Sequence, residues 1–113
     1  MDASAALTEL LATSTEVVEA VVTGPAGDVE ASRTCSAERA AALAATGVEL
    51  LSAAAGVHAG APVEHVRVDL ERGSVVALTD GTRRIVATTV ARPTGALVAY
   101  DLRTVLVRAG GAE

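Results

Sequence analysis

The sequence contains no phenylalanine, no tryptophan and no lysine, and it has a single tyrosine, Tyr100. Apolar residues make up half of the chain, but most of them are small, with 25 alanines and 17 valines against 11 leucines. Because alanine buries little apolar area, a lone domain of this composition has a core of small volume. We therefore expect a single domain over residues 1–113 that associates with a second copy of itself.

Positive charge is also scarce, since nine arginines stand against 14 acidic residues and the net charge is −5. Arg83 and Arg84 form the only basic pair, and no basic stripe is present, so we expect no nucleic-acid partner. Residues 40–58 are mostly apolar, but they are rich in alanine and interrupted by Glu49, which argues against membrane insertion. The N-terminus lacks the basic and apolar regions of a signal peptide, so we expect a cytoplasmic protein. An excess of alanine, glycine, valine and arginine without lysine is typical of a GC-rich bacterial genome.

The chain has only one cysteine, Cys35, which excludes an intramolecular disulfide and a cysteine zinc site. Cys35 precedes a predicted helix, where a thiolate is stabilised, but a nucleophile needs a nearby base and His58 lies at the other end of that helix. His58 and His65 have no obvious further metal ligands beside them. The glycine-rich residues 24–28 are followed by a predicted strand rather than by the helix of a phosphate-binding loop. We therefore expect no catalytic residue, no metal and no cofactor.

Hydrophobic periodicity predicts an α+β fold. Helices are expected over residues 3–14, 36–59 and 96–109, and strands over residues 17–23, 29–33, 63–70, 74–79 and 82–90. Turn sequences at residues 24–28 and at Asp80-Gly81 join neighbouring strands into hairpins. The order helix-strand-strand-helix-strand-strand-strand-helix favours one five-stranded antiparallel sheet with helices packed on its faces.

The predicted long helix, residues 36–59, has two faces of different chemistry. Ser36 is a suitable N-cap, and Gly47 in the middle is either tolerated, at a cost of about 1 kcal/mol relative to alanine, or needed for a close approach to the sheet. One face carries larger apolar residues that we expect in the core: Leu43, Val48, Leu50, Leu51 and Val57. The other face carries mostly small residues: Ala41, Ala45, Glu49, Ser52 and Gly56. This second face is either simply solvated or, as we favour, the contact with a second copy.

Four stretches together resemble the Roadblock/dynein light chain family, in particular its small bacterial members that regulate Ras-like GTPases. The stretches are VVEAVVTGPAGDVEAS, SAERAAALAATGVELLSAAAG, VEHVRVDLERGSVVALTDGTRRIVATTV and GALVAYDLRTVLVRAG. The resemblance implies a profilin-like architecture, with the long helix on one face of the sheet and the terminal helices on the other. It also implies a homodimer in which the long helices lie side by side and the strand over residues 63–70 pairs across the two-fold axis. That strand would contribute Val63, His65 and Arg67 to the dimer interface.

The function that this resemblance implies is a non-enzymatic regulator or scaffold that binds a small Ras-like GTPase and modulates its nucleotide cycle. Such proteins can hold the switch segments of the GTPase in place, which is catalysis by positioning. Glu38, Arg39 and Ala42 are the residues that we expect to contact the GTPase. Arg33 and Arg39 are conceivable arginine fingers, although solvated surface charge is the simpler interpretation. The alternative function is a small-ligand-sensing or general protein-interaction module of similar fold, and ligand sensing would require a polar-lined pocket.

Overall fold

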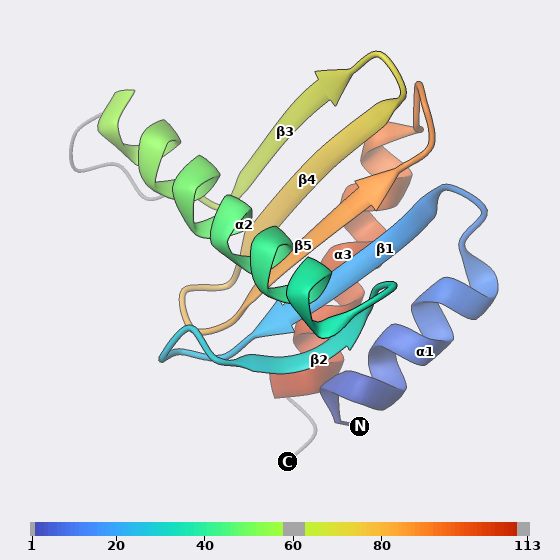
Figure 1. Cartoon of the computed structure of the whole chain (residues 1–113), viewed down its shortest axis with the longest axis horizontal. Coiled ribbons are helices and arrows are strands. Elements are labelled where there is room, and N and C mark those ends of the chain that lie inside the picture. Colours follow the sequence, from blue (N-terminus) through green and yellow to red (C-terminus); the bar gives the residue numbers. More distant parts are fainter. Residues whose placement is uncertain (1, 58–62, 111–113) are drawn as a thin grey trace.

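The computed structural model describes residues 2–57 and 63–110. The described elements are α1 (Ala3–Thr13), β1 (Val17–Thr23), β2 (Val29–Arg33), α2 (Ala37–Val57), β3 (His65–Leu70), β4 (Gly73–Thr79), β5 (Arg84–Thr89) and α3 (Gly95–Gly110). The strands form one antiparallel sheet in the order β2-β1-β5-β4-β3 (Figure 1). The predicted order of elements and the five-stranded antiparallel sheet are confirmed. His58 and the predicted end of the long helix lie outside the described residues.

The sheet separates two apolar layers, as Figure 1 shows, with α2 on one face and both α1 and α3 on the other. Between α1, α3 and the sheet lies the larger cluster, which is built from leucines, valines, alanines and Ile85. The α2 layer is thinner and contains mostly alanine and valine. The arrangement expected from the family resemblance is therefore confirmed.

Local chemistry explains where the helices and turns begin. The Asp2 side chain accepts a hydrogen bond from the Ala5 backbone N–H at 2.7 Å and caps α1. At the start of α2, the Ser36 hydroxyl accepts from the Arg39 backbone N–H at 3.1 Å, as expected of an N-cap. In the β4–β5 turn, Gly81 has a φ of 94°, a conformation that glycine adopts without strain. These interactions are local in sequence, which is why the sequence pattern could predict the Ser36 cap and the Asp80-Gly81 turn.

The buried face of α2 differs from the face that periodicity predicts. Its buried residues are Ala40, Leu43, Ala44, Gly47 and Leu51. The prediction that Val48, Leu50 and Val57 belong to the core is wrong, because Val48 is 38% exposed, Val57 is 75% exposed and Leu50 is only half-buried. The cause is a close approach: a Cβ on Gly47 would lie 2.1 Å from Cγ2 of Val86 on β5. The helix thus turns its smallest residue toward the sheet, and the larger Val48 turns outward.

Candidate interaction surface

Among residues 2–57 and 63–110, nothing covers the outer face of α2. Every residue of its predicted contact set is exposed: Ala41, Ala45, Glu49, Ser52 and Gly56. By length and composition alone α2 is apolar enough to cross a membrane. Only 22% of its most apolar stretch of 18 residues is buried within the protein. The stripe that packs on the sheet explains part of this apolar character. The exposed alanines and Val48 are left without cover in a single copy.

The edge of the sheet beside α2 is also open in the part of the chain that the structure describes, where the edge strand β3 pairs only with β4. The Thr79 N–H donates to the Glu64 carbonyl at 3.0 Å, so the backbone of Glu64 faces β4. Backbone direction alternates along an antiparallel strand, which turns the N–H and C=O groups of His65, Arg67 and Asp69 away from β4. Such a row of unpaired backbone groups is a template for pairing with another strand.

The side chains of β3 alternate between the two faces of the sheet. Val66 and the preceding Val63 pack against the α2 cluster. His65 and Arg67 lie on the α3 side, opposite Leu78 and Val76 of β4, whose side chains belong to the α1/α3 cluster. Burial, together with nearby Arg103 and Arg67, lowers the pKa of His65, so this imidazole is neutral at pH 7.

Asp69 organises the polar side of β3. The Ser74 hydroxyl and Nε of Arg67 both donate to Oδ1 of Asp69, each at 2.6 Å. These two hydrogen bonds, the one from Ser74 foremost, lower the pKa of Asp69. Arg67 therefore already has an acidic partner within its own chain.

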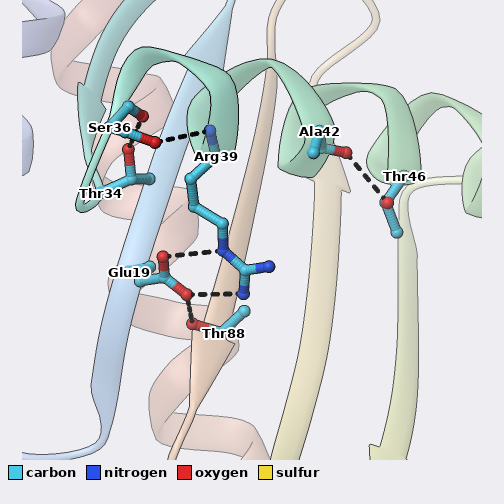
Figure 2. Close-up of polar contacts among 7 residues, drawn as sticks. All are labelled: Glu19, Thr34, Ser36, Arg39, Ala42, Thr46 and Thr88. Atoms are coloured by element: carbon cyan, nitrogen blue, oxygen red, sulfur yellow. Dashed lines mark hydrogen bonds and ion pairs between the residues drawn. The ribbon is translucent and has the colours of Figure 1, made fainter.

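Arg39 is fixed to the sheet beneath the first turn of α2 (Figure 2). Its Nε and Nη2 donate to the two carboxylate oxygens of Glu19 at 3.0 and 2.9 Å, and the Thr88 hydroxyl donates to the same carboxylate at 3.0 Å. The hydrogen bond from Arg39 is the main cause that lowers the pKa of Glu19, with a further contribution from Thr88. Glu38, Arg39 and Ala42 are all exposed, and the Arg39 side chain remains 47% exposed while it is paired with Glu19.

Glu19 and Thr88 were not identified from the sequence. A usable signal was present, because Glu19 stands two residues before Val21 and therefore shares its face of the sheet, the face that α2 covers. An acidic residue at such a position requires a partner. Periodicity alone does not identify that partner, since Arg39 lies 20 residues further along the chain.

The Glu19–Arg39 pair predicts a specific pH dependence of stability. A carboxylate whose pKa is lowered by folding stabilises the protein above its unfolded pKa, and this contribution disappears as the pH falls through the folded pKa. The Glu19→Gln variant should therefore be less stable than wild type at pH 7, and the difference should shrink as the pH falls from about 5 to 3. Urea unfolding followed by far-UV circular dichroism at several pH values measures this. Arg39→Gln should reproduce the behaviour, and a difference that stays constant with pH would exclude the ion pair as its cause.

The other candidate residues have structural partners or lie exposed. Arg33 donates to Ser4 and Thr8 of α1 and so ties β2 to that helix. Cys35 is exposed in the loop before α2. Within residues 2–57 and 63–110, no three His, Cys, Asp or Glu side chains gather as metal ligands would.

A groove of about 210 Å³ between α1 and α3 is lined by Glu9, Asp101 and Arg108, among other residues. Burial raises the pKa of Asp101 in this groove, and nearby Glu16 raises it further. Arg108 of α3 is paired with Glu9 of α1 across the groove. The volume is below the roughly 300–1,000 Å³ of most small-molecule sites, and the groove lies on the side of the sheet opposite α2.

Comparison with known proteins places this arrangement among solved folds. No protein-family model matches the sequence, and no curated protein matches it by sequence. A Roadblock/LC7 domain from Streptomyces avermitilis is similar in structure, with a TM-score of 0.81 and 20% identity over 96% of each chain. The gliding protein MglB from Thermus thermophilus has a TM-score of 0.68 and 18% identity over 98% of this chain and 90% of its own. A structure described as MglB with a tetrameric arrangement has a TM-score of 0.68 and 19% identity over 95% and 85%. The chain therefore has the fold of Roadblock/LC7 domains and of bacterial MglB.

Proposed function

We propose that this chain forms a homodimer that binds a small Ras-like GTPase and modulates its nucleotide cycle without carrying out chemistry of its own. The observation that carries the proposal is the position of two uncovered features on one side of the molecule. Figure 1 shows α2 beside the beginning of β3, so the helix that carries the exposed small residues neighbours the open edge strand. Their position matches the dimer that the family resemblance implies.

The exposed face of α2 and the open edge of β3 are better explained as contacts with a second copy than as surfaces that face solvent. No residue of α2 after Leu51 is buried, so the last turns of the helix contribute little to the core of their own chain. In a dimer built by pairing β3 strands, these turns, which include the exposed Val57, would have a partner surface beside them. Burying such apolar area would supply the core volume that the alanine-rich chain lacks.

The GTPase contact is proposed at the exposed start of α2, at Glu38, Arg39 and Ala42. Because Arg39 is held by Glu19, this chain would act by positioning the GTPase rather than by inserting an arginine.

A pull-down tests the proposed function. The GTPase to use is one with a P-loop that is encoded in a neighbouring reading frame, loaded with GDP or with a non-hydrolysable GTP analogue. We expect capture to depend on the bound nucleotide and to fall at least about tenfold in the Ala42→Arg variant, because a long charged side chain would block a close contact. Ala96→Arg is the matched control, since Ala96 is also exposed but lies on α3, across the sheet. Failure to bind in either nucleotide state would reject the proposal and favour the ligand-sensing alternative.

A further inference from the structure

We propose that β3 pairs with β3 of a second copy about a two-fold axis at Val66, so that His65 of each copy lies opposite Arg67 of the other. This inference rests on the proposed function in taking a second copy as the occupant of the open edge. It adds the register of the pairing, which decides which side chains meet across the interface. The register follows from the backbone, the charges of β3 and the position of α2.

The backbone limits where the axis can pass. A two-fold axis perpendicular to the sheet leaves both α2 helices on the same face and pairs residues at equal distances on either side of it. The groups that point outward belong to His65, Arg67 and Asp69, so these residues must pair with one another. The axis therefore passes at a residue of β3, and positions 66 to 69 leave a usable length of strand on both sides.

Charge removes two of these four positions. An axis at Arg67 would place two arginines directly opposite each other, and an axis at Asp69 would place two aspartates there. Like charges directly opposite are destabilising in a sheet. The remaining positions, Val66 and Val68, both place a pair of valines on the α2 side at the axis.

The position of α2 decides between the two valines. Val63 and Val66 pack against the α2 cluster, and Figure 1 shows α2 over the beginning of β3, away from the β3–β4 turn. Moving the axis from Val66 to Val68 slides the second copy by four residues, or about 13 Å. Packed helices are only about 8–10 Å apart, so one position at most lets the two α2 helices touch. The axis at Val66 is the one beside α2.

Ion pairs do not outweigh the helix contact. An axis at Val68 would set Arg67 opposite Asp69 of the second copy, but Asp69 already accepts from Arg67 and Ser74 of its own chain. Replacing the Arg67–Asp69 pair within one chain by the same pair between two copies would therefore add little to the free energy of association. With the axis at Val66, His65 faces an arginine, and this is tolerated because the imidazole is neutral at pH 7.

Disulfide trapping in a Cys35→Ser background tests the register. In the proposed pairing the two Val66 residues form a non-hydrogen-bonded pair with Cα atoms about 4.5 Å apart, which is within reach of a disulfide. The two Val68 residues would be about 13 Å apart and out of reach. Under copper–phenanthroline oxidation, Val66→Cys should cross-link at least about tenfold faster than Val68→Cys, as read on non-reducing gels.

A mixture of two exposed variants gives a second, independent measurement. His65→Cys mixed with Arg67→Cys should give the heterologous cross-link, because the proposed register sets these positions opposite each other. Light scattering of the Cys35→Ser parent separates the two ideas under test. A dimeric parent that cross-links fastest at position 67 or 68 would overturn the register and leave the proposed dimer standing. A monomeric parent would overturn the dimer and the register together.

Discussion

Replacing Ala45 with glutamate should convert the protein from a dimer to a monomer. Ala45 is exposed on the outer face of α2, where the helix presents mainly small residues. A glutamate there would hold two copies apart by its size and would have to be desolvated beside Glu49 without a basic partner on that face. Burying an unpaired carboxylate costs several kcal/mol, so the dissociation constant of the dimer should rise at least about a hundredfold.

The spacing of the small residues explains why Ala45 is the residue to change. The midpoint of Ala45 and Ser52 along the sequence falls between Val48 and Glu49, and the midpoint of Ala41 and Gly56 falls at the same place. Two antiparallel copies of α2 centred there would set a small residue opposite a small residue at both positions. Close contact between helix backbones requires this arrangement.

Size exclusion with light scattering, at tens of micromolar protein, measures the change in mass. Ala96→Glu is the matched control, because it introduces the same side chain at an exposed alanine of α3 and should leave the dimer intact. A wild-type protein that is monomeric at this concentration would refute the interpretation of the α2 face. So would an Ala45→Glu variant that keeps the dimer mass.

The sequence predicted the elements well where their causes are local. The β1–β2 hairpin, the β3–β4–β5 meander and the three helices follow from alternation, turn residues and caps that lie within a few residues of one another. The Asp80-Gly81 turn is an example, because Asp80 accepts from the backbone N–H groups of Thr82 and Arg83, each at 2.8 Å. Such interactions do not depend on the rest of the chain.

The rotation of α2 on the sheet was not predictable in the same way. Periodicity assigns the largest apolar residues to the core, and this placed Val48 and Val57 inward. The actual orientation depends on the fit of Gly47 against Val86, which lies 39 residues away in the sequence. The Glu19–Arg39 pair was missed for the same reason, since its two partners come from different elements. Long-range contacts of this kind decide which face of an element is used, and residue size alone does not reveal them.

Gly47 should therefore be the residue of α2 at which the smallest change costs the most stability. An added Cβ would lie 2.1 Å from Cγ2 of Val86 and 3.3 Å from its Cβ. Val86 is 1% exposed and stiff at χ1, so it has no room to turn away. Overpacking costs about 1–3 kcal/mol, whereas alanine gains about 1 kcal/mol over glycine in helix propensity. Gly47→Ala should be destabilised by up to about 2 kcal/mol, against the direction that helix propensity predicts.

Gly56→Ala is the matched control, because the same Cβ at Gly56 has nothing within 4 Å. Helix propensity then acts alone, and this variant should be neutral or stabilised by up to about 1 kcal/mol. Both substitutions belong in the Ala45→Glu background, where assembly through the α2 face does not contribute to the measured stability. Urea unfolding followed by circular dichroism gives the two free energies of unfolding. If Gly47→Ala proves as stable as Gly56→Ala, then α2 does not approach β5 closely at Gly47, and the explanation of its rotation fails with it.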